Sequence, residues 1–141
     1  MQRQLSILVA LILLLGLLPM PTKAQRASYN GRIAPQGINL RHGQFISYSF
    51  EIPESEHYGI VRGWFAVKGS NRLDVRVLIL DSSNLDNFKN GDSFSNYLDT
   101  GLQHSANINV RLPRGQFYLV FDNTHSLLTN KSLRTDLTLL W

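Results

Sequence analysis

The residues best suited to chemistry in this chain are its four histidines and its scattered carboxylates. His42, His57, His104 and His125 lie far apart in polar or turn contexts, without the HxH or HExxH spacing of a metal site. The Gly-x-Ser-x-Gly turn that exposes a nucleophilic serine is absent, and so is cysteine. The sequence therefore predicts a protein that is not an enzyme and has no cofactor. A small hydrolase is the alternative if scattered histidines and acids converge in one pocket.

Two groups of oxygen-bearing side chains are close together in the sequence. Glu51, Glu54 and Glu56 flank one turn, which is typical of a solvated turn rather than of paired catalytic acids. The second group offers the oxygen ligands that calcium prefers: Asp81, Asn84, Asp86, Asn87, Asn90 and Asp92. Its spacing is not that of an EF-hand, and a capped short helix uses the same residue types. We expect no metal site, and a structural calcium ion is the alternative.

The basic residues are spread singly along the chain. Lys and Arg number 14 against 10 Asp and Glu, and the formal net charge is +4. Binding of nucleic acid requires a concentrated basic patch, and the sequence contains no basic run. We therefore predict that nucleic acid is not a partner.

The first 24 residues have the three parts of a secretory signal peptide. Arg3 precedes an apolar run from Leu5 to Leu18, and a proline-containing segment follows with small residues at Thr22 and Ala24. The run has 14 residues, whereas a membrane-spanning helix needs about 20. We predict cleavage after Ala24, a secreted, periplasmic or cell-envelope location, and no membrane span in the mature chain. An uncleaved anchor is the alternative.

The rest of the chain has the length and patterning of one all-β domain. Apolar and polar residues alternate over segments 46–52, 58–68, 73–80, 94–98, 106–112, 117–121 and 133–141. Ser83 could cap one or two helical turns that end at Asn90-Gly91. We predict an antiparallel β-sandwich or jelly roll of seven to eight strands with one short helical turn. Residues 36–141 form the domain, and the polar residues 25–35 form a flexible N-terminal segment.

Trp64 shares its predicted strand face with Arg62 and Lys68. Because tryptophan is mostly buried in folded proteins, we expect a loop or the second sheet to cover it. If Trp64 is exposed instead, it is a candidate for stacking on a sugar, and a carbohydrate- or matrix-binding module becomes the alternative function.

The most specific motif lies between residues 115 and 133. Gly115 opens an aromatic strand that ends in Phe-Asp-Asn-Thr at residues 121–124, Ser126 follows, and Lys131 opens the last strand. This pattern resembles the C-terminal half of the GOLD (Golgi dynamics) domain, although His125 stands where that family has an aromatic residue. Residues 69–77 also look like the small jelly-roll domains appended to secreted bacterial peptidases.

The GOLD resemblance implies a β-sandwich that recognises proteins or lipids. The sequence departs from the family's cargo receptors in ending at Trp141, so we expect a secreted, bacterial-type form without their transmembrane tail. We therefore expect an exported, non-catalytic binding module in the cell envelope or secretory space. A protein is the first expected partner, with lipid or glycan as alternatives.

Four polar residues of this motif are candidates for binding, together with Trp64. Asp122 and Asn123 end a buried strand, where such side chains can hydrogen-bond the turning backbone. Lys131 could pair with Asp122 across the loop, beside His125. We expect a structural role for these residues, and ligand contact is the alternative.

Overall fold

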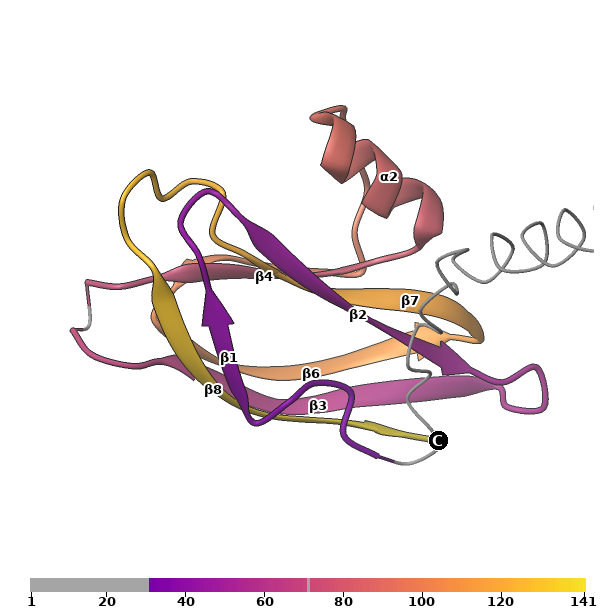
Figure 1. Cartoon of the computed structure of the whole chain (residues 1–141). Coiled ribbons are helices and arrows are strands. Elements are labelled where there is room, and N and C mark those ends of the chain that lie inside the picture. Colours follow the sequence, from indigo (N-terminus) through magenta and orange to yellow (C-terminus); the bar gives the residue numbers. More distant parts are fainter. Residues whose placement is uncertain (1–30, 71) are drawn as a thin grey trace, which may run out of the picture.

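The computed structural model of the protein describes residues 31–70 and 72–141, so the predicted signal peptide at residues 1–24 lies outside the described residues. Eight strands form two antiparallel sheets that pack face to face, and one helix joins two of the strands (Figure 1). The elements are β1 (Gly37–Leu40), β2 (Phe45–Ile52), β3 (Tyr58–Val67), β4 (Val75–Leu80), α2 (Ser82–Asn90), β5 (Leu98–Gln103), β6 (Ser105–Pro113), β7 (Gly115–Asp122) and β8 (Lys131–Leu140).

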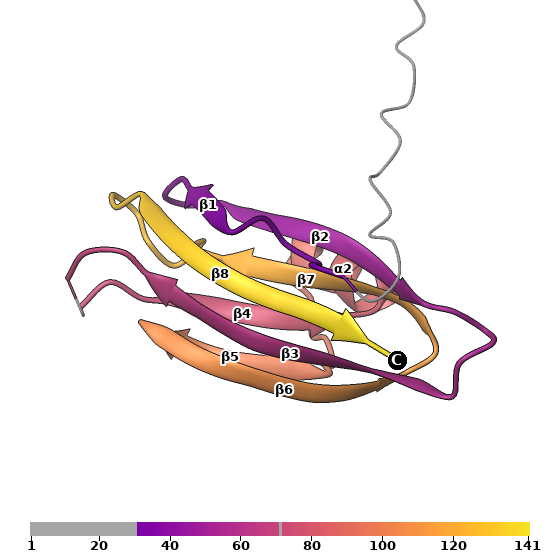
Figure 2. The ribbon, with the colours of Figure 1, turned by 90° about the horizontal axis from the view of Figure 1, so that it is seen from below.

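The strand order identifies the architecture as a jelly roll. Sheet A has the order β1-β8-β3-β6 and sheet B the order β2-β7-β4-β5 (Figure 2). The outer pairs of the two sheets are β1–β8 and β3–β6 in sheet A, and β2–β7 and β4–β5 in sheet B. In each pair the strand numbers add up to nine, which is the pairing of one long hairpin that has been rolled up. The pairs β3–β8 and β4–β7 complete the two sheets. The predicted all-β sandwich is therefore confirmed.

The core lies between the sheets because every second residue of each strand points inward. The largest fully buried side chains of the described residues are Phe50, Phe65, Phe121, Leu40, Ile52, Leu78, Ile79, Leu80, Leu112, Leu119, Leu133 and Leu137. Most belong to one cluster between the sheets, but Leu78 and Leu80 point to the opposite side of sheet B.

Helix α2 covers the outer face of sheet B (Figure 1). Its buried residue Leu85 packs with Leu78, Leu80 and Val120 in a second apolar cluster, which explains why β4 is apolar on both faces. Phe88 of α2 contacts Phe94 edge-on, with ring centroids 5.6 Å apart. Among the described elements, no helix covers the outer face of sheet A.

Two predicted element boundaries are wrong for physical reasons. Asp81, not Ser83, is the N-cap of α2, because its carboxylate accepts a hydrogen bond from the backbone N–H of Asn84 at 2.9 Å. The predicted strand at 94–98 is absent, since Phe94 packs against α2, and β5 begins only at Leu98. Gly91, as expected, ends the helix in a left-handed conformation.

Residues 31–35, predicted to be flexible, pack on the sandwich instead. Ile33 and Ala34 are buried in the main core. The backbone N–H of Ile33 donates to the carbonyl of Leu137 at 3.0 Å, and that of Leu139 donates to Gly31 at 2.9 Å. The described part of the N-terminal segment is therefore part of the domain.

Candidate functional site

Four connections meet at one end of the sandwich, which we call the loop end (Figures 1 and 2). They are the connections between β1 and β2 (41–44), β3 and β4 (68–74), β7 and β8 (123–130), and β5 and β6 (His104). The pairing of β1 with β8 and of β2 with β7 brings the first and third connections side by side. The backbone N–H of Gly43 donates to the carbonyl of Ser126 at 2.8 Å, and the His42 N–H donates to Asn130 Oδ1 at 2.9 Å.

Asp122 and Asn123 are buried at the base of the 123–130 connection. The carboxylate of Asp122 accepts a hydrogen bond from the Thr124 N–H at 2.8 Å, as expected of an Asx turn. The amide nitrogen Nδ2 of Asn123 donates to the carbonyls of Arg41 at 3.1 Å and Thr129 at 3.0 Å. Both side chains therefore fix the path of the backbone.

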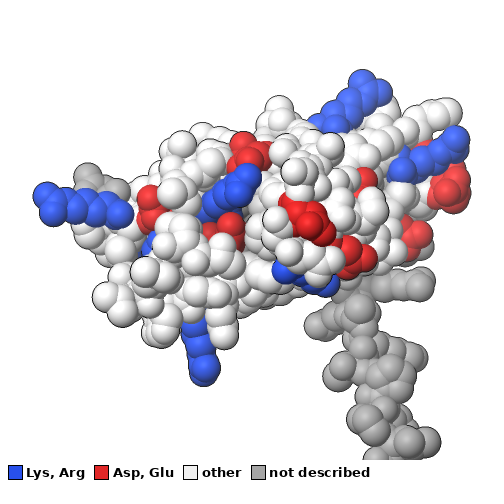
Figure 3. Space-filling view, turned by 90° about the horizontal axis from the view of Figure 1, so that it is seen from above, with Lys and Arg blue, Asp and Glu red and all other residues white. Residues whose placement is uncertain are grey.

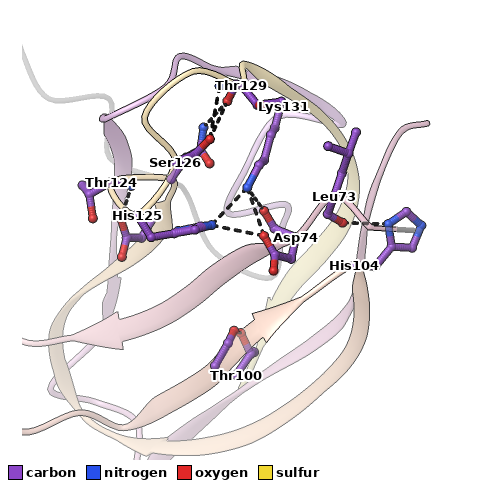
Figure 4. A network of polar contacts seen from close by, with 12 residues as sticks. Leu73, Asp74, Thr100, His104, Thr124, His125, Ser126, Thr129 and Lys131 are labelled. Atoms are coloured by element: carbon purple, nitrogen blue, oxygen red, sulfur yellow. Dashed lines mark hydrogen bonds and ion pairs between the residues drawn. The ribbon is translucent and has the colours of Figure 1, made fainter. Parts of the chain in front are cut away.

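Lys131 is buried, with 3 % of its side chain exposed, and its partner differs from the predicted one. Its ammonium group donates to Oδ1 of Asp74 at 3.1 Å and to the Asp74 carbonyl, and it lies 3.1 Å from Nε2 of His125 (Figure 4). The prediction that Lys131 pairs with Asp122 is wrong because the Asp122 carboxylate caps the adjacent turn, whereas Asp74 is brought in by the 68–74 connection.

Asp74, His125 and Lys131 form one polar cluster at the loop end. Partial burial favours the neutral form of Asp74, but hydrogen bonds from Lys131 and His125 outweigh it and hold the pKa of this carboxyl below its usual range. Nε2 of His125 lies 3.1 Å from both the Asp74 oxygen and the Lys131 nitrogen. In the neutral ring, Nε2 of His125 either carries a proton and donates to Asp74, or carries none and accepts from Lys131. The tautomer of His125 therefore decides which of these two hydrogen bonds forms.

The tip of the 123–130 connection presents two leucines to solvent. Leu127 is 81 % exposed and Leu128 is 90 % exposed, the highest values among the large apolar residues described. They lie between Ser126 and Thr129. The Ser126 hydroxyl donates to the Thr129 carbonyl and accepts from the Thr129 N–H, each at 3.2 Å (Figure 4). This pair is not among the site residues expected from the sequence, although adjacent leucines in a polar segment are a signal of an exposed apolar contact.

Exposed basic side chains also occur on the neighbouring connections of the loop end. Arg41, Lys68 and Arg72 belong to the two neighbouring connections, and the structure gives none of them an ion pair with a described acid. The charge of Asp74 is balanced by Lys131. The loop end therefore carries two exposed leucines and, on its other connections, three exposed cations.

Trp64 lies apart from the other candidates, on the outer face of sheet A. It is 41 % exposed, so the expectation that it is covered is wrong. The helix that could have covered a sheet face lies on sheet B instead. In register, Trp64 has Asn107 of β6 on one side and Asp136 of β8 on the other.

The oxygen-rich segment 81–92 is used by helix α2 and its flanks. Asp81 accepts hydrogen bonds from the side chains of Ser83 and Asn84, and Oδ1 of Asn84 accepts one from the Ser95 N–H at 2.7 Å. Within residues 31–70 and 72–141, no group of three or more His, Cys, Asp or Glu residues is placed to hold a metal ion.

Other surface properties bear on the classes of partner. On the face shown in Figure 3, Lys and Arg are interspersed with Asp and Glu, and they form no continuous basic patch. No helix in the described part of the chain is long and apolar enough to cross a membrane.

Comparison with known proteins gives no match, either to a family model or to a curated protein sequence. The resemblance to GOLD domains therefore rests on residues 115–133 alone and stays a prediction.

Proposed function

We propose that this chain is an exported, non-catalytic binding module that docks through its loop end on a bilayer surface containing anionic lipids. The observation that carries the proposal is the exposure of Leu127 and Leu128 at the tip of a braced connection. Adjacent leucines that reach this far into water are typical of a contact surface rather than of a free surface.

The energetics of such a contact suit reversible attachment. Burying the two leucine side chains contributes about 3–6 kcal/mol. Each of the exposed cations Arg41, Lys68 and Arg72 adds about 1 kcal/mol close to an anionic surface. After the costs of association, this is enough for reversible binding and too little for permanent anchoring.

The bracing of the connection supports the proposal because a pre-ordered loop loses little conformational entropy on binding. Asn123 joins the 123–130 connection to Arg41, and Ser126 accepts a bond from Gly43. Lys131 joins the same connection to Asp74. In this proposal the motif residues hold the loops in place, and the leucines make the contact.

The remaining parts of the proposal rest on other features. Export is supported by the signal-like pattern of residues 1–24. A non-catalytic role is supported by the sequence, which has no cysteine and no Gly-x-Ser-x-Gly turn. The exposed cations on the neighbouring connections support an anionic lipid surface over the apolar pocket of a partner protein, the partner class expected first from the sequence.

Co-sedimentation with vesicles tests the proposal. The exported, processed chain is mixed with vesicles of phosphatidylcholine alone or with added phosphatidylglycerol. We expect binding to the mixed vesicles, weakened by salt. The double variant Leu127→Ser/Leu128→Ser should lower the partition coefficient about 100-fold or more. Leu102→Ser is the matched control, because Leu102 is an exposed leucine on β5, the edge strand of sheet B two strands away from β7.

The outcomes separate the partner classes. Absence of binding to both kinds of vesicle, or binding unchanged by the double leucine variant, would contradict the lipid proposal. Capture of one protein from the envelope fraction, lost in the same double variant, would assign the loop end to a protein partner instead. Replacing Arg41, Lys68 and Arg72 with Gln should weaken binding to the mixed vesicles only.

A further inference from the structure

The outer face of sheet A carries a second set of exposed side chains that the loop end does not use. Trp64 stands in the middle of β3, and its indole is one of the larger apolar surfaces left open on the described domain. The corresponding face of sheet B is covered by α2 and its aromatic residues. A wide aromatic ring on the uncovered face offers a flat contact area to a ligand.

A hollow of about 290 Å³ lies beside Trp64, against the edge strand β6. Its lining residues are Trp64, Phe65, Ala66, Ser105, Ala106 and Asn107. The volume is close to the lower limit of small-molecule sites, about 300 Å³, and it suits one sugar ring. The small side chain of Ala66 leaves room beside the indole, while the hydroxyl of Ser105 and the amide of Asn107 stand at the margin of the hollow.

This combination matches the two surfaces of a sugar ring. The faces of a pyranose carry C–H groups, which pack well on an indole ring. Its edge carries hydroxyls, which exchange hydrogen bonds with side chains such as Ser105 and Asn107. An open hollow on a flat sheet also leaves room for the rings before and after the bound one, so a polysaccharide fits better than a free monosaccharide.

The charges around Trp64 select among sugars. Arg62 lies two residues before Trp64 on the same face, and Arg134 of β8 is the register partner of Ala66. Both are exposed, and the structure gives neither an ion pair with any described acid. Asp136 is paired with Arg32 at 3.2 Å. The surroundings of Trp64 are therefore complementary to an anion.

We infer that the outer face of sheet A binds an acidic polysaccharide whose sugar rings carry carboxylate groups. Trp64 stacks on one ring in the hollow, and Ser105 and Asn107 hydrogen-bond its hydroxyls. The guanidinium groups of Arg62 and Arg134 pair with carboxylates along the polymer, since the planar fork of arginine matches a carboxylate. This site goes beyond the proposed membrane contact and does not depend on it.

The test is binding of the intact, processed protein to immobilised polysaccharides: polygalacturonate, dextran sulfate and uncharged dextran. We expect binding to polygalacturonate, weakened by salt, and about tenfold or more weaker binding to uncharged dextran. Trp64→Ala should weaken binding to polygalacturonate about tenfold or more, and Trp64→Phe should retain part of it because a ring face remains. Urea unfolding checks that each variant is folded.

Charge variants near Trp64 test recognition directly, because a purely structural role of these residues would leave polysaccharide binding unchanged. The double variant Arg62→Gln/Arg134→Gln should weaken binding several-fold, about as expected for two exposed charge contacts. Asp136→Asn should strengthen it, because it removes a negative charge beside Trp64. Leu127→Ser/Leu128→Ser should leave polysaccharide binding unchanged, so failure here and failure of the membrane proposal are distinguishable.

Three outcomes would overturn the inference. Equal binding to uncharged dextran would make the face a site for neutral sugars. Stronger binding to dextran sulfate than to polygalacturonate would assign the anion to sulfate. Binding that is absent, or unaffected by Trp64→Ala in a folded variant, would show that this face does not recognise polysaccharide.

Discussion

The ammonium nitrogen of Lys131 lies 3.1 Å from Oδ1 of Asp74, which precedes it by 57 residues. Lys131 is the first residue of β8 in sheet A, and Asp74 immediately precedes β4 in sheet B. The contact therefore joins the two sheets where the connections of the loop end meet. Because Lys131 is almost fully buried and Asp74 is partly exposed, the two charges do not contribute alike to stability.

Replacing Lys131 should lower stability. Lys131→Ala removes hydrogen bonds to Asp74 and leaves a cavity, so the free energy of unfolding should fall by about 1–3 kcal/mol. Urea unfolding measures this, with Lys68→Ala as an exposed control that should change it by less than about 0.5 kcal/mol. Equal stabilities of the two variants would contradict a structural role for Lys131. Vesicle binding should fall less than in the double leucine variant.

Stability should decrease in acid. The pKa of Asp99 is lowered by hydrogen bonds from Arg76, that of Asp81 by the Asn84 N–H, and that of Asp74 as described above. A carboxyl with a lowered folded-state pKa stabilises the fold above its unfolded pKa of about 3.9. That stabilisation is lost as the pH falls through the folded-state pKa.

The free energy of unfolding should therefore fall as the pH drops below about 5 and continue to fall below about 3.9. Urea unfolding over a pH series measures the slope. Asp99→Asn removes the carboxylate that accepts two bonds from Arg76, at 2.9 and 2.6 Å, and should flatten the slope. An unchanged slope in this variant would argue against a contribution from the Arg76 pair.

The helix cap can be tested with neighbouring residues. Asp81→Ala should cost about 0.5–2 kcal/mol of stability because the first turn of α2 loses its acceptor. Ser83→Ala is the matched control, since the Ser83 hydroxyl only donates to Asp81 at 3.1 Å. Denaturant unfolding followed by far-ultraviolet circular dichroism compares them. A larger loss of stability in the Ser83 variant would instead identify Ser83 as the N-cap, as predicted from the sequence.

Gly63 should tolerate no side chain. Its φ is +141°, and a Cβ atom would lie 1.8 Å from the carbonyl oxygen of Asp136 in β8. Gly63→Ala should therefore cost about 3 kcal/mol or more, or prevent folding. Gly37→Ala, where a Cβ would meet nothing within 4 Å, is the control and should fold with nearly unchanged thermal stability. Similar melting temperatures would contradict the close approach of β3 and β8.

The strands of the core were predictable because burial on one face imposes a period of two. β2 and β3 begin within a residue of their predicted starts. β1 was missed because Gly37–Leu40 is too short to show the period, although Ile38 and Leu40 are buried as it requires. β5 was misplaced because an exposed edge strand carries little apolar alternation.

The partner of Lys131 and the exposure of Trp64 were harder to predict, because both depend on how distant parts of the chain pack. Lys131 was expected to pair with the nearby Asp122, but strand pairing places Asp74 within its reach. The exposure of Trp64 depends on which sheet α2 covers, and the one sign of that choice in the strand pattern is the apolar second face of β4 at Leu78 and Leu80. Local turn chemistry was predictable, since the Asp122 carboxylate bonds its own turn as expected.

The central place of β8 in sheet A has a consequence for the order of folding. β8 lies between β1 and β3, so two of the three strand pairs of that sheet need residues 131–140. These residues are synthesised after all the other described strands, and β1 has no partner strand until they emerge. The contacts of such a sheet are far apart in sequence, so it forms slowly. A ribosome-bound chain that lacks β8 therefore leaves β1 unpaired and sheet A reduced to the pair of β3 and β6.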